Sequence, residues 1–325
     1  MPFFDRPLAE LEHLEPSDPA PPDFDVFWDR TLAEARAAGG SMELTPQPTA
    51  IEAFRVFDVR FPGFGGEPIG GWLIAPREPR GPAMVAFQGY NAGRGDPVQW
   101  LGWPSAGFTT LVMDTRGQGS VPNYPGVTPD PHGHGPATLG MRTRGIDDPE
   151  TYYYRRVFTD AVRAVDAVRT LDGVDPQRVG VVGGSQGGGI ALAAAGLHDG
   201  VAAALIDVPF LCDFRRAVGL TGAEPYEEIT RYLAAHRGSN DRVFRTLSYF
   251  DGISFAARAT APALVSVALQ DAICPPSTVF AAFNAYGGPA EIDVFPFNGH
   301  EGGGAVQWER QARFVRSHLG NQDER

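Results

Sequence analysis

Residues 179–197 read Val-Gly-Val-Val-Gly-Gly-Ser-Gln-Gly-Gly-Gly-Ile-Ala-Leu-Ala-Ala-Ala-Gly-Leu. The first part, residues 179–183, is a short unbroken apolar run, which is typical of a β-strand buried on both faces. A glycine-rich turn around Ser185 follows at once, and the small residues at 190–197 then predict a helix. A buried strand that leads through a tight turn into a helix indicates an α/β fold with a mainly parallel sheet.

The rest of the chain alternates between the same two kinds of element. Strands are predicted at residues 51–61, 69–75, 83–87, 109–113, 202–208, 263–269 and 292–295. Helices are predicted at residues 23–39, 148–171, 277–285 and 303–318. This alternation favours helices on both faces of the sheet.

The domain organisation follows from the same pattern. Residues 211–258 read as an irregular helical insertion before the strand at 263–269, and the sequence leaves open whether this insertion forms a lid. We find no linker and no internal repeat. The sequence therefore predicts one domain over residues 1–325, with an N-terminal extension through residue 45 that contains the first helix.

The composition excludes several kinds of function. The 325 residues carry a formal net charge of −12, so nucleic acid and anionic membrane surfaces are poor partners. All 27 basic residues are Arg, which excludes Schiff-base and Lys general-base chemistry. The two cysteines are too few for a disulfide framework, and the first residues lack the apolar core of a signal peptide. We therefore expect a soluble, cytoplasmic protein.

Residues 183–187, Gly-Gly-Ser-Gln-Gly, match the G-x-S-x-G pattern of a nucleophile elbow. In that turn the nucleophile adopts a strained backbone conformation, so the residues two positions away must be small. Gly183 and Gly187 meet this requirement. The alternative is a glycine-rich turn with an incidental serine, for example a phosphate site. The strand and helix on either side favour Ser185 as a nucleophile.

A serine nucleophile needs a base, and the base needs an orienting acid. In this kind of site the chain order is serine, acid, histidine. His300 follows the last predicted strand on a glycine-flanked loop. His236 and His318 lie on charged helical stretches, where solvent exposure is expected. The sequence therefore predicts His300 as the base.

Two strand ends compete for the acid. Asp271 follows the strand at 263–269, two strands beyond the nucleophile, which is the usual position. Asp207 lies at the end of the strand directly after the elbow and precedes Val208-Pro209, where a capping or turn role explains it. We predict Asp271 as the acid and keep Asp207 as the alternative.

Two backbone N–H groups are expected to bind the oxyanion of an acyl-transfer intermediate. One belongs to Gln186, the residue after the serine. The other comes from the loop after the strand at 83–87, where Gly89 allows close approach and Tyr90 supplies the N–H. The Tyr90 ring also suits aromatic packing, and the two roles are compatible.

Other motifs carry weaker signals. His132 and His134 lie in a Pro/Gly-rich loop, but no third ligand completes a metal-binding pattern. Cys274 precedes two prolines, and we interpret it as a small core residue rather than a reactive thiol. The glycines at 63–66 and 117–119 lack the spacing of a dinucleotide fingerprint. We therefore expect no metal and no cofactor.

Three segments together resemble the signatures of carbohydrate esterase family 7, the acetyl xylan esterases and cephalosporin C deacetylases of the α/β-hydrolase superfamily. They are Asp114-Thr-Arg-Gly-Gln-Gly119, Gly183-Gly-Ser-Gln-Gly187 and His300-Glu301. Residues 143–146, 148–156 and 271–277 support the same resemblance, which spans the chain from the N-terminal helix to His300.

This resemblance implies an α/β-hydrolase fold and specific roles for the residues above. The catalytic triad would consist of Ser185, Asp271 and His300. The two oxyanion donors would be Tyr90 and Gln186. A structural segment beneath the active site would consist of Arg116, Gly117 and Gln118. The implied activity is cofactor-free deacetylation of short acetylated sugars and of cephalosporin C. The implied assembly is a ring-like, cytoplasmic homohexamer.

One position departs from the family. The family commonly has His before Gly-Tyr, whereas this chain has Gln88, so we expect a pocket of different polarity. Fold and triad together leave open a short-chain carboxylesterase, a thioesterase, a peptidase or a non-catalytic binding protein. Because every expected site residue is present, the sequence favours a serine esterase that removes small acyl groups.

Overall fold

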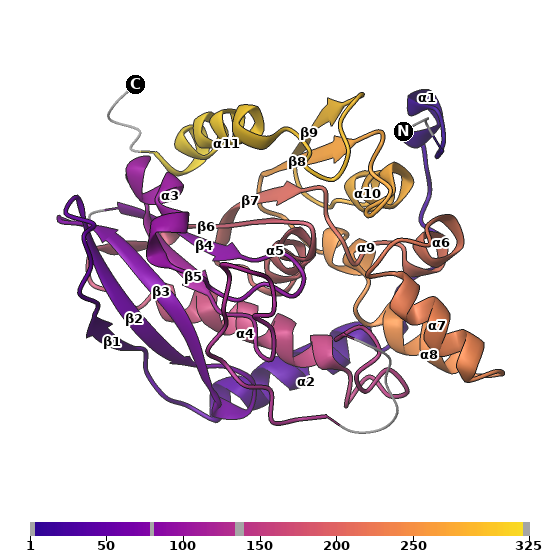
Figure 1. Ribbon diagram of the computed structural model, residues 1–325, viewed down its shortest axis with the longest axis horizontal. Helices are drawn as coiled ribbons and strands as arrows, with labels where there is room; N and C mark the ends of the chain where they lie inside the picture. The colour runs from indigo at the N-terminus through magenta and orange to yellow at the C-terminus, as the bar shows by residue number, and fades with distance from the viewer. Residues whose placement is uncertain (1–3, 79–80, 134–139, 321–325) are drawn as a thin grey trace.

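The computed structural model describes residues 4–78, 81–133 and 140–320, and it contains a nine-stranded sheet (Figure 1). The strands are β1 (Glu43–Pro46), β2 (Phe54–Pro62), β3 (Pro68–Pro76), β4 (Gly81–Phe87), β5 (Thr109–Met113), β6 (Val174–Gly184), β7 (Val201–Asp207), β8 (Ala263–Ala268) and β9 (Ala290–Phe295). Their order across the sheet is β1-β2-β3-β5-β4-β6-β7-β8-β9. Strands β1, β2, β3 and β5 pair antiparallel, and all pairs from β5 to β9 are parallel.

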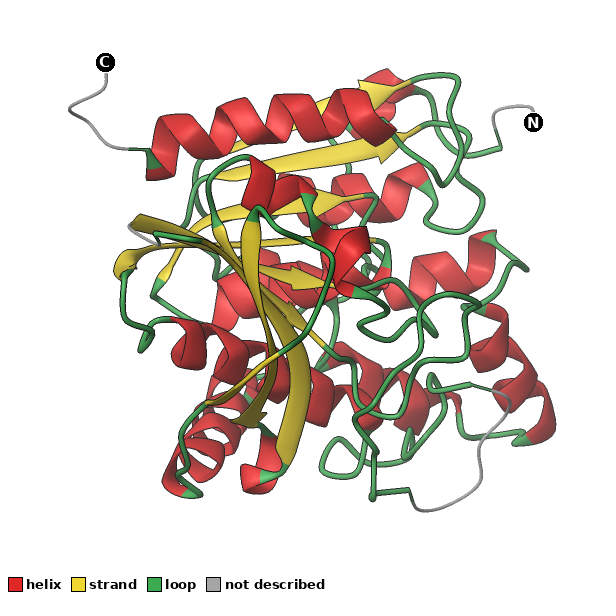
Figure 2. Ribbon diagram, turned by 60° about the vertical axis from the view of Figure 1, so that its left-hand side comes forward, coloured by secondary structure: helices red, strands yellow, loops and turns green. Residues whose placement is uncertain are grey.

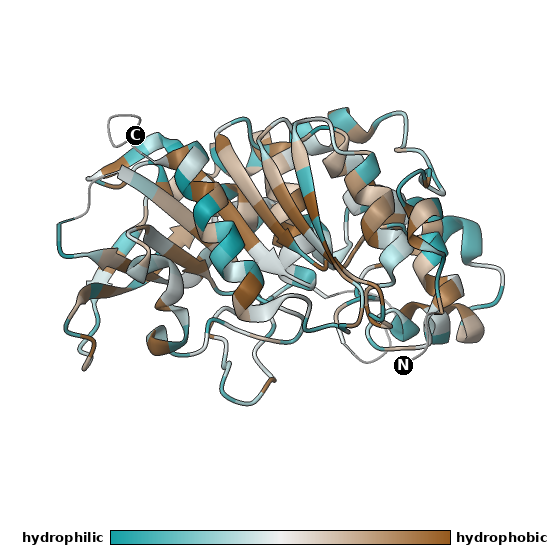
Figure 3. Cartoon of the chain, turned by 90° about the horizontal axis from the view of Figure 1, so that it is seen from above, coloured by the Kyte–Doolittle hydropathy of each residue, from teal (hydrophilic) through white to brown (hydrophobic). Residues whose placement is uncertain are grey.

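Helices cover both faces of this sheet (Figure 2). One face packs against α2 (Phe24–Ala37), α4 (Tyr153–Val168), α5 (Gln186–Leu197), α9 (Gly252–Ala256) and α10 (Pro276–Asn284). The other face packs against α3 (Gly102–Ser105) and α11 (Gly304–Leu319). The central strands are apolar because both of their faces are covered, as their colouring in Figure 3 shows. The predicted α/β-hydrolase architecture is confirmed.

The chain between β7 and β8 contains the predicted helical insertion. It comprises α6 (Phe214–Leu220), α7 (Glu227–Ala235), α8 (Asn240–Ser248) and α9. Figure 1 shows α6, α7 and α8 at one end of the molecule, on the side to which the parallel strands point. The remaining short elements are α1 (Leu8–Leu11), η1 (Phe64–Gly66) and η2 (Pro97–Trp100). The insertion therefore lies where the loops after the parallel strands gather.

Some boundaries differ from the sequence predictions. The helix predicted from residue 148 begins at Tyr153, because Asp148 caps a turn in which its side chain accepts the Glu150 N–H at 2.9 Å. Strand β1 was not predicted, since its four residues are all exposed and show no alternation. The first difference lies at an element end, and the second adds a short edge strand; neither changes the order of the predicted elements.

Two observations concern the environment of the chain. Within the described ranges, no helix combines the length and the apolar character that crossing a bilayer requires. Cys212 and Cys274 are both buried, and neither forms a disulfide. Burial raises the pKa of both thiols well above the usual value, so both stay protonated. They act as small core residues, as predicted for Cys274.

Candidate active site

Ser185 lies in a strained turn between β6 and α5. Its backbone angles are φ 55° and ψ −122°, in a region that non-glycine residues rarely adopt. A Cβ on Gly183 would lie 2.2 Å from the carbonyl oxygen of Gly187, and one on Gly187 would lie 2.3 Å from that of Phe87. The Ser185 N–H donates to the Asp207 carbonyl at 3.0 Å, which ties the turn to β7. The two flanking glycines are therefore required by the close approach of the backbone, as the elbow pattern predicts.

His300 and Asp271 meet at the ends of the last two strands. The His300 Nδ1 and the Asp271 Oδ2 are 2.8 Å apart. The other carboxylate oxygen of Asp271 accepts the N–H groups of Ile273 at 2.8 Å and Cys274 at 3.0 Å. Asp271 is fully buried, and the Gln270 N–H donates to the Asn298 carbonyl, which links the two loops. This network fixes the imidazole, leaving its Nε2 as the nitrogen available to a proton donor.

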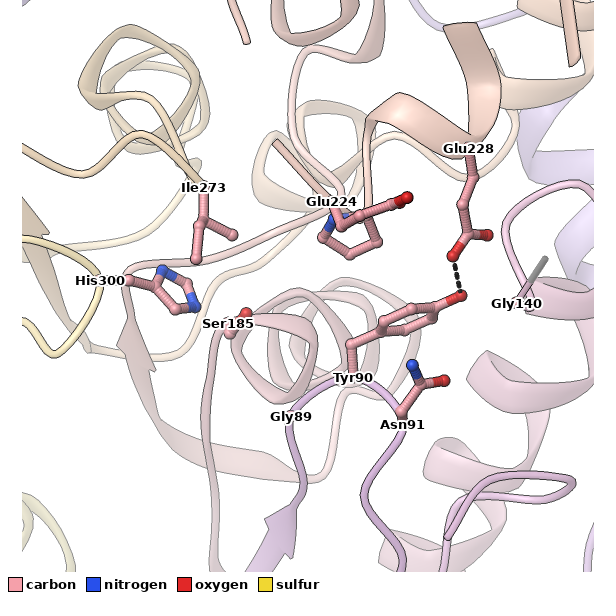
Figure 4. A pocket seen from close by; sticks show the side chains of 10 residues that line it. Gly89, Tyr90, Asn91, Gly140, Ser185, Glu224, Glu228, Ile273 and His300 are labelled. Carbon is pink, nitrogen blue, oxygen red and sulfur yellow. Dashed lines mark hydrogen bonds between the residues drawn. The ribbon is translucent and has the colours of Figure 1, made fainter. Parts of the chain in front are cut away.

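Ser185 and His300 line one pocket of about 500 Å³. Figure 4 shows the His300 ring extending toward Ser185 at one end of this pocket, with Tyr90 farther along it. Its lining residues are Gly89, Tyr90, Asn91, Gly140, Ser185, Glu224, Pro225, Glu228, Ile273 and His300. The pocket thus combines the predicted nucleophile and base with three residues from the insertion that the sequence analysis did not identify.

Of the two predicted oxyanion donors, Gln186 lies in the elbow itself and Tyr90 lies in the loop after β4. Gln186 is the first residue of α5, so its N–H has no partner within that helix. Among the described residues, the backbone hydrogen bonds of turns, loops and helix caps do not include the Gln186 N–H or the Tyr90 N–H as a donor. The start of α5 adds a positive helix-dipole end at the same place. Both N–H groups are therefore available to a developing oxyanion.

The Gln118 side chain holds these two segments together. Its Nε2 donates to the Gln186 Oε1 at 2.9 Å, and its Oε1 accepts the Asn91 N–H at 2.7 Å. Gln118 Nε2 also lies 3.0 Å from the Tyr153 hydroxyl, and the Tyr154 hydroxyl donates to Gln186 Oε1 at 2.8 Å. The structural role implied for Gln118 thus has a specific form, which is a bridge between the start of α5 and the loop that contains Tyr90 and Asn91.

Arg116 lies in the same segment but belongs to a buried ion-pair network. Its guanidinium donates to the two carboxylate oxygens of Asp160 at 2.6 and 2.8 Å, and it also contacts Glu67. Burial opposes the charge on Arg116, yet these acidic partners raise its pKa above the usual value. Gly117 has φ 70°, a left-handed conformation that suits glycine. Arg116 and Gly117 therefore shape the loop and do not line the pocket.

Asp207, the alternative acid, makes a different set of contacts. One carboxylate oxygen accepts the Ser266 hydroxyl at 2.8 Å, and the other accepts the Gln311 amide at 2.8 Å. Burial raises its pKa. Asp207 therefore anchors α11 to the sheet, which differs from the expected capping or turn role.

The other histidines lie elsewhere. His236 stacks on Tyr232 with ring centroids 4.3 Å apart, and His318 stacks on Phe314 at the same distance. His132 lies 2.6 Å from a Glu67 carboxylate oxygen, while His134 lies outside the described residues. Of the three candidate bases, the structure brings only His300 to Ser185.

One cluster of described residues has the spacing of metal ligands. Ligand atoms of Asp271, Cys274 and His300 lie within 4.8 Å of one another. However, burial keeps the Cys274 thiol protonated, and Asp271 already accepts hydrogen bonds from His300 and two backbone groups. This donor set fits a hydrogen-bonded acid–base pair better than a metal centre.

Gln88 lies beneath the oxyanion loop. It is buried, and its amide oxygen accepts the Thr115 hydroxyl at 3.1 Å. Its backbone carbonyl lies 3.4 Å from the Gln186 amide nitrogen. Gln88 is not among the residues that line the pocket. Its expected effect on pocket polarity would therefore have to be indirect.

Comparisons with known proteins agree with this geometry. The family model "Acetyl xylan esterase (AXE1)" matches residues 1–318. An acetyl xylan esterase from Paenibacillus sp. R4 is 40% identical, with a TM-score of 0.91 over 97% of this chain and 100% of that one. Acetyl xylan esterase 1 from Thermoanaerobacterium sp. JW/SL YS485 is 36% identical, with a TM-score of 0.90 over 97% and 99%.

A curated relative is longer than this chain. Acetyl esterase Axe7A of Xylanibacter ruminicola is 28% identical over 298 residues, which are 89% of this chain. The match spans 65% of the length of that relative. The family match, in contrast, covers nearly all of the sequence and includes every residue of the pocket. The chain belongs to the acetyl xylan esterase (AXE1) family.

Proposed function

We propose that this protein is a serine esterase that removes acetyl groups from acetylated xylooligosaccharides and related small esters. The observation that carries the proposal is the 2.8 Å contact between His300 Nδ1 and Asp271 Oδ2, beside Ser185 at a strained elbow. Membership of the acetyl xylan esterase family supports the acetyl group as the acyl part. The pocket of about 500 Å³ has room for a small sugar ester.

The first half of the reaction forms an acetyl-enzyme. His300 Nε2 takes the Ser185 hydroxyl proton while the serine oxygen attacks the ester carbonyl carbon. The carbonyl electron pair moves onto oxygen, where the N–H groups of Tyr90 and Gln186 stabilise the negative charge. The intermediate then expels the sugar oxygen, which takes the proton from His300. Asp271 stabilises the imidazolium throughout.

The second half returns the enzyme to its starting state. Water gives a proton to His300 and attacks the acetyl carbonyl carbon, again with the charge held by the two N–H groups. The bond to Ser185 breaks, and the serine oxygen recovers its proton from His300. Acetate leaves, and no metal or cofactor takes part in these steps.

A serine substitution tests the assignment of the nucleophile. Ser185→Ala removes the attacking oxygen, so acetate release from acetylated xylooligosaccharide should fall to the uncatalysed background with no change in thermal unfolding. Ser248→Ala is the matched control, because this half-buried serine lies outside the pocket and its hydroxyl donates to the Arg245 carbonyl one helical turn away. Persistent acetate release by Ser185→Ala would contradict the proposal.

A comparison of substrates separates the deacetylase from the other hydrolases that share this fold and triad. A panel of acetyl esters, longer acyl esters, thioesters and peptides should show the highest kcat/KM for acetyl esters. A higher kcat/KM for peptides or thioesters would contradict the deacetylase assignment and would still be consistent with Ser185 as the nucleophile.

Three finer proposals rest on the family resemblance. We propose that cephalosporin C is also a substrate, that the chain assembles as a homohexamer, and that the protein works in the cytoplasm. The free, protonated thiols of Cys212 and Cys274 support a reducing compartment. The acidic net charge of −12 supports small neutral esters over polyanions as binding partners.

A further inference from the structure

The Tyr90 hydroxyl is held by a carboxylate from the insertion. It donates to the Glu228 Oε1 at 2.7 Å and accepts the Met141 N–H at 2.6 Å. The other oxygen of Glu228 accepts the Arg142 N–H at 3.1 Å. Glu228 lies in the first turn of α7, and Figure 4 shows its carboxylate facing the Tyr90 hydroxyl across the pocket. The insertion is thereby linked to the loop that carries a predicted oxyanion donor.

The surroundings of this link are closely packed. A Cβ on Gly140 would lie 2.1 Å from the Glu228 Oε1 and 2.3 Å from the Tyr90 hydroxyl oxygen. The guanidinium of Arg142 lies 4.7 Å from the centre of the Tyr90 ring and 3.4 Å from that of Phe210. Glu228 is only 4% exposed. There is little room for the Tyr90 side chain to shift without breaking these contacts.

The charges around Glu228 explain how it can act as an acceptor in a buried place. Burial raises the pKa of its carboxyl group, whereas Tyr90 and Arg142 act in the opposite direction by hydrogen bonding and charge. Burial also raises the pKa of the Tyr90 hydroxyl, which therefore stays protonated and remains a donor. The pair is thus a hydroxyl that donates and a carboxyl group that accepts.

We propose that Glu228 is a positioning residue for the oxyanion-binding N–H of Tyr90. This inference rests on the proposed esterase function. The loop around Tyr90 contains Gly89 and the left-handed Asn91 at φ 61°, so its local backbone is only weakly constrained by its own sequence. Gln118 fixes one side of the loop through the Asn91 N–H, and Glu228 fixes the other through the Tyr90 hydroxyl.

The position of the Tyr90 N–H should matter for the reaction rate because a hydrogen-bond donor stabilises an oxyanion only over a short distance. A donor works when it lies about 2.7–3.1 Å from the oxyanion, and losing one such donor lowers kcat by about 10²–10³. Displacing the donor should cost less than losing it. Because the oxyanion exists only in the transition state and the tetrahedral intermediate, the effect should fall on kcat and not on KM.

The substitution Glu228→Gln tests this role. The carboxylate accepts two N–H or O–H donors, whereas the amide has one oxygen and would point its NH₂ group at the second donor. We expect kcat on acetylated xylooligosaccharide to fall about tenfold with KM changed by less than about twofold. An unchanged kcat, or a loss confined to KM, would overturn the proposal.

The matched control is Glu227→Gln on the same helix. Glu227 is more exposed and pairs with Arg231 at 2.8 Å, so the same chemical change there should leave kcat and KM unchanged. An equal loss of kcat in this control would mean that the effect belongs to α7 as a whole, which also overturns the proposal. Ser185→Ala tests the esterase function separately, so failure of one idea is distinguishable from failure of the other.

A second variant, Tyr90→Phe, tests the same contact from its other side and does not depend on whether Glu228→Gln folds. Tyr90→Phe removes the hydroxyl and keeps the backbone N–H, so it should lower kcat by a similar factor. If Glu228 acts through this hydroxyl, the double variant should be no slower than the slower single variant. Fully additive losses would overturn the proposal.

A tetrahedral inhibitor gives a readout that a purely structural role would not move. An alkyl trifluoromethyl ketone adds to a serine hydroxyl, forming a C–O bond while the proton moves to the histidine, and its new oxyanion occupies the same site. Its inhibition constant should rise about tenfold in Glu228→Gln, in parallel with the loss in kcat/KM. An inhibition constant equal to that of the unsubstituted protein would contradict the proposed role.

Discussion

Asp207 and Asp271 are buried carboxylates at the ends of two neighbouring parallel strands, β7 and β8, yet their partners differ. Asp271 is bound by His300 and two backbone N–H groups. Asp207 is bound by the neutral side chains of Ser266 and Gln311, and burial raises its pKa. At the scale of single residues, the hydrogen-bond partners favour Asp271 over Asp207 as the predicted catalytic acid.

This difference leads to opposite expectations for two matched substitutions. Asp271→Asn removes the charge that stabilises the His300 imidazolium and disturbs its tautomer, so kcat/KM should fall about 10³–10⁴-fold. Asp207→Asn should keep most of the activity and lower the free energy of unfolding by about 1–3 kcal/mol, since an amide cannot accept from both partners. Aryl acetate hydrolysis and urea unfolding measure the two effects. A larger loss of activity in Asp207→Asn than in Asp271→Asn would mean that Asp207 is the catalytic acid and Asp271 the structural one.

Two helices of the insertion, α6 and α9, are joined at their starts by the carboxylate of Asp251. Asp251 accepts the N–H groups of Asp213 and Phe214 at 2.9 Å, where α6 begins, and that of Ile253 at 3.1 Å, where α9 begins. These bonds satisfy N–H groups that a helix start leaves free. Even so, burial raises the pKa of Asp251 to about 7. The joint between the two helices therefore titrates near neutral pH.

The sign of this shift gives a pH dependence at the scale of these elements. The folded protein binds the Asp251 proton up to about pH 7, whereas the unfolded chain releases it near 3.8. The contribution of this group to stability therefore falls as the pH rises from 4 to 7. Relative to the unsubstituted protein, Asp251→Asn should gain up to about 4 kcal/mol in unfolding free energy over that range.

Denaturant unfolding at several pH values measures this gain. Asp241→Asn, an exposed residue in the first turn of α8, is the matched control and should show a much smaller change with pH. The idea fails if the stability difference between Asp251→Asn and the unsubstituted protein is constant from pH 4 to 7.

Across the whole molecule, the features that the sequence predicted depend on local pattern. The apolar run before Ser185, the two flanking glycines and the glycine-flanked His300 each carry their signal within a few residues. Asp271 was predicted from the order of the strands along the chain. Because consecutive parallel strands lie side by side in the sheet, their carboxyl ends, and the loops that follow them, are neighbours. These cues were sufficient to predict the order of the main elements and the three residues, Ser185, His300 and Asp271, that the structure brings together.

The insertion side of the pocket was not predictable in the same way. Glu228 meets Tyr90 across 138 residues of sequence, and its acidic helical surroundings look like an exposed surface. Arg142 is completely buried against aromatic rings, although an isolated Arg in a loop is normally exposed. Such contacts depend on how separate elements pack, and no periodicity within either segment reports them.

Arg116 shows how one long-range contact supports several elements at once. Its guanidinium joins Asp160 on α4 to Glu67 just before β3, and it lies 3.7 Å from Asp130 in the long loop after β5. Arg116, Asp160 and Asp130 are all almost fully buried. Removing the cation would leave two buried carboxylates without this partner.

The substitution Arg116→Met should therefore destabilise the whole fold by about 3–5 kcal/mol, the usual result of breaking a buried ion pair from one side. Arg313→Met is the matched control, because Arg313 is exposed and pairs with Glu309 across one helical turn; its effect should be below about 1 kcal/mol. Urea unfolding of both variants measures the contrast. If the two variants unfold at the same urea concentration, the buried network has no net stabilising role, and the Arg116 segment must be retained for another reason.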